Sequence, residues 1–137
     1  MSLPQYVSWF WSGAKATETI SVPSFSYSMG TQRENDSRTK TVKSNLVGYL
    51  EMDVNWSWSW SGNTGGSLNQ NWRLKNSSNS TVYQTSGGGS GGSKSFTITG
   101  LDPSETYYIQ MNSSSSGGSF MERNATGSIN YTALVQV

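Results

Sequence analysis

Apolar and polar residues alternate with a period of two along most of this sequence, and no segment shows the period of about 3.6 residues that marks a helix. The alternation predicts strands separated by turns rich in Ser, Asn and Gly. The predicted strands cover residues 19–29, 46–61, 68–75, 81–85, 95–99, 106–112 and 128–137, and a short aromatic run covers residues 6–11. We therefore expect residues 1–137 to form a single all-β domain, an antiparallel β-sandwich or jelly roll of about eight or nine strands.

Two polar segments and one proline interrupt the alternation. Residues 31–45 mix basic with acidic side chains and are predicted to form an exposed loop or an edge strand, where positive charge discourages pairing with other chains. The run SGGGSGGS at residues 86–93 is predicted to be a flexible loop. Pro23 stands where the alternation changes phase within residues 19–29, and this predicts a bulge or an edge because proline cannot donate a ladder hydrogen bond.

The stretch LEMDVNWSWSWSG at residues 50–62 places tryptophan at every second position. Residues two apart on a strand share a face and lie about 6.7 Å from each other. The residues on this face are Leu50, Met52, Val54, Trp56, Trp58 and Trp60. We interpret the face as part of the core, because the indoles continue an aliphatic row without a change of phase. The alternative is a strand that overhangs the core, so that Trp58 and Trp60 are exposed and stack on sugar rings or on a neighbouring subunit.

The aromatic run near the N-terminus is apolar on both of its faces. Val7, Trp9 and Trp11 share one face, and Tyr6 and Phe10 share the other. In a sandwich one face of each strand is normally covered, so the second face needs another partner. The run predicts an N-terminal arm, roughly residues 1–12, that docks against another copy of the chain. A doubly covered strand, or an arm that adheres to its own domain, is the alternative.

Composition narrows the chemistry available to this chain of 137 residues. Only 12% of the residues are charged and the net charge is +1, so there is no general attraction to nucleic acid or to an acidic membrane surface. No run approaches the roughly 18 consecutive apolar residues of a membrane span. Cysteine and histidine are both absent, which removes disulfides, thiolate and imidazole metal ligands, and the usual general base. We expect neither enzymatic activity nor a cofactor or metal.

The remaining candidates for chemistry are carboxylates and hydroxyls. Glu51 and Asp53 share a strand face at a spacing that suits a pair of catalytic carboxylates, but an ordinary polar face explains them better. Ser12 and Lys15 resemble a serine–lysine pair only loosely in a chain this rich in serine. A calcium site would have to use Asp53, Asp102 or Glu105, and no clustered acidic loop supports one.

The segment TITGLDPSETYYIQM at residues 97–111 carries the clearest resemblance to known families. Leu101, Pro103 and Tyr107, followed by alternating Ile109 and Met111, resemble the corner between strands E and F of fibronectin type III and other Ig-like sandwiches. Together with the ending INYTALVQV, the segment also resembles the jelly-roll domains of the pre-peptidase C-terminal type in secreted bacterial proteins. The resemblance implies a tyrosine corner, in which the Tyr107 hydroxyl bonds to backbone upstream.

These features indicate a non-enzymatic structural protein. We expect a subunit of an extracellular fibre or a virion-type assembly, and therefore a homo-oligomer or polymer that associates through strand edges and through the arm residues Tyr6, Val7, Trp9, Phe10 and Trp11. The alternative is a carbohydrate-binding or adhesion module that uses Trp58 and Trp60 to bind a glycan. Either function places the chain outside the cell, on a cell surface or in a virion.

Overall fold

All eight regular elements in the described part of the chain are strands, which confirms the all-β prediction. The computed structural model describes residues 16–62, 65–118 and 121–137. The strands are β1 (Thr17–Gln32), β2 (Ser37–Val47), β3 (Tyr49–Ser61), β4 (Ser67–Asn76), β5 (Thr81–Gly88), β6 (Gly91–Ile98), β7 (Thr106–Ser116) and β8 (Arg123–Gln136). Within these ranges no helix is long and apolar enough to cross a membrane.

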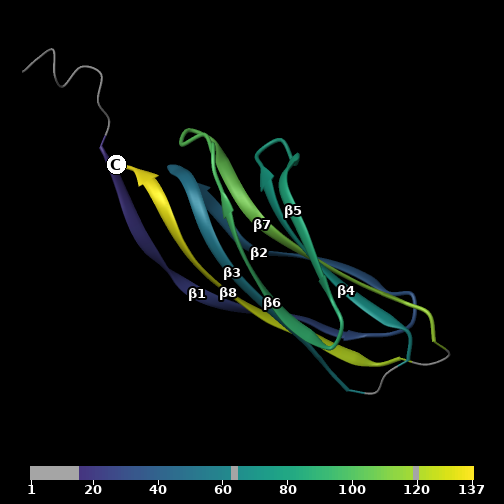
Figure 1. The fold of residues 1–137 in the computed structure, drawn as a ribbon. Helices are drawn as coiled ribbons and strands as arrows, with labels where there is room; N and C mark the ends of the chain where they lie inside the picture. Colours follow the sequence, from purple (N-terminus) through teal and green to yellow (C-terminus); the bar gives the residue numbers. More distant parts are fainter. Residues whose placement is uncertain (1–15, 63–64, 119–120) are drawn as a thin grey trace, which may run out of the picture.

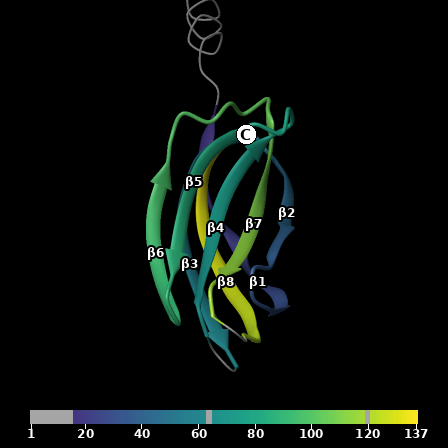
Figure 2. The same cartoon turned by 90° about the vertical axis from the view of Figure 1, so that its right-hand side faces the viewer.

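The strands form two four-stranded antiparallel sheets that pack face to face (Figure 1 and Figure 2). The first sheet has the order β1-β8-β3-β6, and the second sheet has the order β2-β7-β4-β5. Consecutive strands are neighbours only at β4 and β5, and most connections cross between the sheets. This order is that of a jelly roll. It confirms the sandwich prediction and restricts the fibronectin-like resemblance to the segment that carries it.

The tryptophan row of β3 faces the core. Met52, Val54 and Trp56 are at most 1% exposed, and Trp58 and Trp60 are each 8% exposed. The facing residues of the second sheet are also buried, namely Leu68, Trp72, Leu74, Ile109 and Met111. Leu50, which was also predicted to belong to the buried row, is only half-buried. A register shift between Tyr49 and Glu51 turns its side chain out of the row. The interpretation of the row as core is therefore confirmed.

The glycine-rich run at residues 86–93 is not the loop that its composition predicts. β5 continues to Gly88 and β6 begins at Gly91, so most of the run belongs to strands. A Cβ atom at Gly87 or at Gly92 would overlap the indole of Trp58, and the Trp58 N–H donates to the Gly88 carbonyl at 3.1 Å. These glycines provide space for a buried ring, and the prediction of a flexible loop was wrong.

Basic side chains close the two open sides of the sandwich. Arg38 and Lys40 on the edge strand β2 donate to the carbonyls of Met29 and Ser28 on β1, each at 3.3 Å. On the other side, Lys94 of the edge strand β6 donates to the Ser86 carbonyl of β5 at 2.7 Å. Inward-pointing charges on edge strands discourage further strand pairing. The predicted edge in residues 31–45 is therefore present, as β2.

Two further sequence predictions are confirmed by the backbone. β1 is an edge strand whose register shifts between Val22 and Phe25, the segment that holds Pro23. The tyrosine corner is also present, since Tyr107 is 5% exposed and its hydroxyl accepts the Asp102 N–H at 3.0 Å. The corner fixes the end of the sandwich at which the connection from β6 enters β7.

Candidate functional site: the outer face of the first sheet

The site residues predicted from aromatic content divide into two groups. Trp58 and Trp60 belong to the core, so they do not form the exposed pair that stacking on a glycan requires. The strand does not overhang the sandwich, because β5 and β6 cover the Trp58 indole from the side. The arm residues Tyr6, Val7, Trp9, Phe10 and Trp11 lie outside the described residues.

Three of the four carboxylates considered for catalysis or calcium binding, namely Asp53, Asp102 and Glu105, have local structural partners. Asp53 accepts the Thr97 hydroxyl at 2.6 Å on the surface of the first sheet. Hydrogen bonds from Ser104 lower the pKa of Asp102, and hydrogen bonds from Ser77 lower the pKa of Glu105. In the described residues no group of three or more His, Cys, Asp or Glu side chains is placed to hold a metal ion.

The outer face of the first sheet has an unusual composition over most of its length. The side chains opposite the buried row are short, polar and uncharged, and neighbouring strands align them in rows across the sheet. Three of these rows are Ser26–Ser128–Ser57–Ser93, Ser28–Thr126–Ser59 and Thr31–Asn124–Ser61. A fourth row, Asn130–Asn55–Ser95, continues toward the other end. We call this surface the hydroxyl face.

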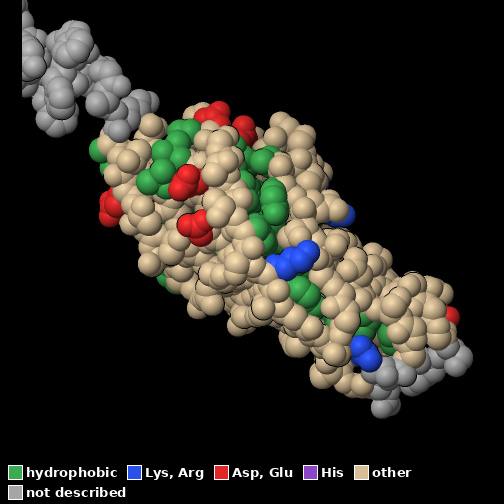
Figure 3. Space-filling model, in the orientation of Figure 1, with side chains coloured by type: hydrophobic (Ala, Val, Ile, Leu, Met, Phe, Trp, Pro, Cys, Tyr) green, Lys and Arg blue, Asp and Glu red, His purple; other side chains and the backbone are tan. Residues whose placement is uncertain are grey.

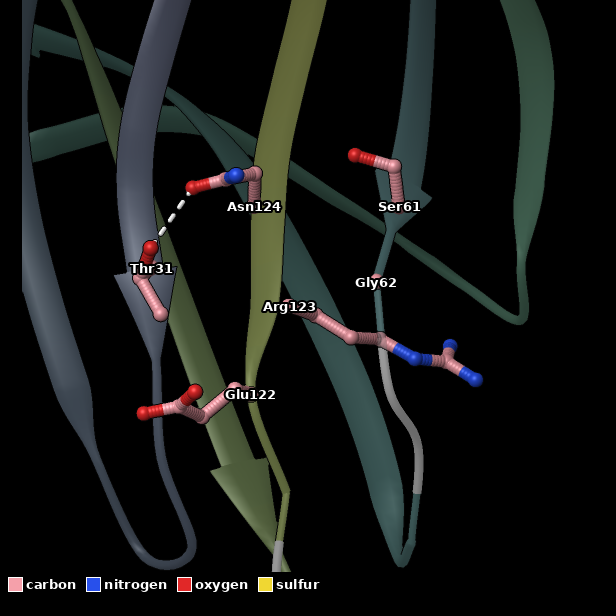
Figure 4. A pocket seen from close by; sticks show the side chains of 6 residues that line it. All are labelled: Thr31, Ser61, Gly62, Glu122, Arg123 and Asn124. Atoms are coloured by element: carbon pink, nitrogen blue, oxygen red, sulfur yellow. Dashed lines mark hydrogen bonds between the residues drawn. The ribbon is translucent and has the colours of Figure 1, made fainter.

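Hydroxyl groups on this face pair directly across strands. Ser57 and Ser128 lie 2.8 Å apart, and Ser59 and Thr126 lie 3.0 Å apart, each pair joining β3 to β8. The Thr31 hydroxyl donates to the Asn124 side chain at 2.8 Å and so joins β1 to β8 (Figure 4). These pairs hold the side chains in fixed positions on the sheet.

The hydroxyl face is hollowed where these pairs lie. A hollow of about 550 Å³ is lined by Ser26, Tyr27, Ser57, Trp58, Ser59, Thr126, Gly127 and Ser128. Tyr27 and Trp58 point inward, so their backbone contributes to its floor. A smaller hollow of about 270 Å³ follows along β3 and β8 and is lined by Thr31, Ser61, Gly62, Glu122, Arg123 and Asn124. We call the two hollows together the hydroxyl groove.

Charged side chains enter the groove only at its far end. Figure 4 shows Glu122 and Arg123 pointing to opposite sides of β8, with Glu122 toward β1 and Arg123 toward β3. Glu122 forms an ion pair with Arg33 at 3.2 Å. The larger hollow has no charged residue in its lining.

An apolar surface lies at the opposite end of the first sheet. Leu50 and Leu134 are half-buried and Val137 is 66% exposed. Figure 3 shows hydrophobic side chains gathered at this end, with acidic side chains around them. We call Leu50, Leu134 and Val137 the terminal patch. Five of the eight acidic residues of the chain belong to this end, namely Glu18, Glu51, Asp53, Asp102 and Glu105.

Solved structures similar to this chain share its fold at low sequence identity. The VP2 subviral particle of infectious bursal disease virus aligns with a TM-score of 0.55 and 15% identity over 88% of this chain. A mutant VP2 protein of infectious bursal disease virus, from derived T=1 particles, aligns with a TM-score of 0.51, also at 15% identity over 88% of this chain. This chain spans about a third of the length of these VP2 chains, 33% and 32%.

A carbohydrate-binding module of the β-sandwich superfamily aligns with a TM-score of 0.39 and 11% identity, over 93% of this chain and 60% of the module. That score is too low to support an inference about this chain. No protein-family model matches the chain, and no curated protein sequence does. What is established is the fold, an all-β jelly-roll sandwich that the VP2 structures share.

Sequence reasoning did not find the hydroxyl groove, although one signal for it was present. Asn55, Ser57 and Ser59 alternate with the tryptophans, so their outward orientation follows from the buried row. Their partners Thr126 and Ser128 come from the last strand, and only the strand order shows that β8 lies beside β3.

Proposed function

We propose that this chain is a non-enzymatic structural protein that associates with other copies of itself, as a subunit of a virion-type or extracellular assembly. The observation that carries the proposal is the terminal patch. Leu50, Leu134 and Val137 leave apolar surface in water at the end of the first sheet where β1 begins. Contiguous exposed apolar surface typically marks an interaction site.

The patch lies beside the first described residue of the chain. The Val137 N–H donates to the Ala16 carbonyl at 3.0 Å, so Ala16, to which residues 1–15 are covalently joined, lies beside the patch. Those residues contain the aromatic run at 6–11 and Lys15, and they contain no acidic residue. An apolar segment without negative charge suits an apolar surface that acidic side chains surround. We place the contact between the patch of one copy and residues 6–11 of another.

Strand edges offer a weaker route to association. Three of the four edge strands carry features that oppose pairing: Pro23 and register shifts in β1, Arg38 and Lys40 in β2, and Lys94 in β6. The jelly-roll fold is compatible with an assembly role, since the VP2 neighbours come from a subviral particle and from derived T=1 particles.

Light scattering across a concentration series tests this function. We expect the full chain to form species larger than one copy, and we expect a chain lacking residues 1–12 to remain folded and monomeric. The double variant Leu50→Asp with Leu134→Asp should also be monomeric, whereas Val82→Asp, at a position that is 43% exposed on β5, should assemble like the parent. A full chain that stays monomeric throughout, or a truncated chain that assembles like the parent, would show the proposal to be wrong.

A further inference from the structure

We propose that the hydroxyl groove is a binding site for a linear, uncharged glycan, which is a neutral ligand with many hydroxyl groups. The groove lies on the outer surface of β1, β8 and β3. Of the two tryptophans that the sequence suggested for such a ligand, Trp60 is not in its lining, and Trp58 contributes through its backbone because its indole points into the core. It is separate from the terminal patch, so the inference does not depend on self-association.

The hydrogen-bonding capacity of the groove matches a sugar chain. A serine or threonine hydroxyl has one proton to donate and two lone pairs to accept. In the pair Ser57–Ser128 one proton and one lone pair are used, which leaves one donor and three acceptor positions for a ligand. The pair Ser59–Thr126 offers the same set, one row farther along the groove. Sugar hydroxyls are likewise both donors and acceptors, so they can satisfy both pairs.

The electrostatics of the groove favour a neutral ligand. The larger hollow has no charged lining residue, and the four strands of the first sheet hold only two basic residues, Lys94 and Arg123. A phosphate, a sulfated chain or an acidic peptide would find no cation where the hollow is widest. Arg123 and Glu122 lie at the end of the groove and have opposite signs.

The composition of the groove is also unlike that of a protein interface. The centres of protein interfaces are enriched in aromatic residues, Met and Arg, and they are depleted in Ser. Four of the eight residues that line the larger hollow are Ser, and its aromatic members point into the core. A second protein would bury these hydroxyls against a surface that cannot satisfy all of them, at a cost for each unpaired group.

The groove is preorganised for binding. Ser57 and Ser59 lie on β3, a strand with neighbours on both sides, and the tryptophan row fixes the backbone beneath them. Short hydroxyl side chains lose little conformational entropy when a ligand binds. We expect a dissociation constant in about the millimolar range, because no aromatic ring in the groove offers a stacking surface and each hydrogen bond exchanges with water.

Amide NMR titration of the full chain tests the inference. The probes are linear neutral hexasaccharides of glucose, xylose, mannose and galactose, with an oligogalacturonate as the acidic comparison. We expect at least one neutral probe to shift the amides of residues 26–28, 57–59 and 126–128 at millimolar concentration. The oligogalacturonate should bind more weakly than the neutral chain that binds best.

A matched pair of variants assigns the binding to the groove. Ser57→Ala with Ser128→Ala removes one hydroxyl pair, and we expect the affinity of the best probe to fall about tenfold. Ser37→Ala with Ser114→Ala removes two serines that face each other across β2 and β7 of the second sheet, and affinity should be unchanged. The inference is wrong if no neutral probe shifts these amides, if the acidic probe binds best, or if both double variants bind like the parent.

Discussion

Tyr27 joins three strands through the middle of the core. Its hydroxyl accepts the Trp56 indole N–H at 2.8 Å and donates to the Gln70 side-chain oxygen at 2.6 Å. The three side chains come from β1, β3 and β4, so this chain of hydrogen bonds links both sheets. Gly127 makes room for it, because a Cβ atom there would overlap the Tyr27 hydroxyl. The Tyr27 hydroxyl is therefore the hydrogen-bond partner of two buried polar groups, the Trp56 N–H and the Gln70 side-chain oxygen, and buried polar groups need such partners.

Removing that hydroxyl should be costly. Tyr27→Phe leaves the Trp56 N–H and the Gln70 oxygen buried without a partner, and each unsatisfied group costs about 1 to 3 kcal/mol. We expect the free energy of unfolding to fall by about 2 to 6 kcal/mol in urea titrations. Tyr83→Phe is the control, since the Tyr83 ring is only half-buried. Equal losses in the two variants would contradict the role of the hydrogen-bond chain.

The same tyrosine makes stability sensitive to alkaline pH. Burial raises the pKa of Tyr27 from 10.0 to about 12, and the hydrogen bond from Trp56 offsets part of the effect. Between these values the unfolded chain releases a proton that the folded chain keeps, so stability falls as pH rises through the window. We expect the urea midpoint to fall more steeply above pH 10 in the parent than in Tyr27→Phe. Identical slopes would exclude Tyr27 as the responsible group.

At the scale of elements, β5 and β6 need glycine where they pack against the Trp58 indole. Gly87→Ala would drive a methyl group into the Trp58 indole, whereas a Cβ at Gly88 would make ordinary contacts of 3.5 Å or more. We expect Gly87→Ala to cost about 1 to 3 kcal/mol, as overpacking of a core does, and Gly88→Ala to be close to neutral. Chemical denaturation followed by tryptophan fluorescence measures both. A neutral Gly87→Ala would show that the indole moves aside.

The corner between β6 and β7 can be tested separately from the core. Tyr107→Phe keeps the buried ring and leaves the Asp102 N–H without the acceptor that lies 3.0 Å away. We expect a loss of about 1 kcal/mol with the fold retained. Hydrogen exchange at Asp102 should quicken, while exchange in the centre of β3 should not change. If the Asp102 amide exchanges at the same rate in both proteins, the bond contributes nothing.

These elements show what could be predicted from the sequence. Alternation within one strand placed Trp56, Trp58 and Trp60 in the core, because residues two apart on a strand share a face whatever the rest of the chain does. The prediction of a flexible loop from composition was wrong at Gly87 and Gly92, because glycine occurs both in flexible loops and at positions packed against a large side chain.

The register and the order of the strands could not be predicted from the sequence. Leu50 leaves the buried row because the pairing of β3 with β8 shifts there, which depends on contacts between distant segments. The hydroxyl groove and the terminal patch both combine β8 with β3, and the groove adds β1. No local pattern indicates which strands become neighbours in a jelly roll.

For the whole molecule, the basic residues on the edge strands β2 and β6 are expected to reduce aggregation. The Lys94 ammonium group on the edge strand β6 donates a hydrogen bond to β5, and Lys94→Val would replace it with an apolar side chain. We expect more aggregation on heating, because an inward charge protects an edge from pairing. Lys75→Val is the control, since Lys75 lies on β4, which has a neighbour on each side. Light scattering during a thermal ramp would show the difference, and equal aggregation of both variants would contradict it.

The pairing of β1 with β8 has a consequence for the order in which the molecule folds. β8 lies between β1 and β3, and Thr17 at the start of β1 is paired with Gln136 at the end of β8. While the chain is being synthesised, β1 and β3 have no strand to join them until β8 leaves the ribosome. Contacts between such distant residues form slowly, since a long loop must close first. We therefore expect the first sheet to remain open during translation until all of β8 has left the ribosome, and to close only then.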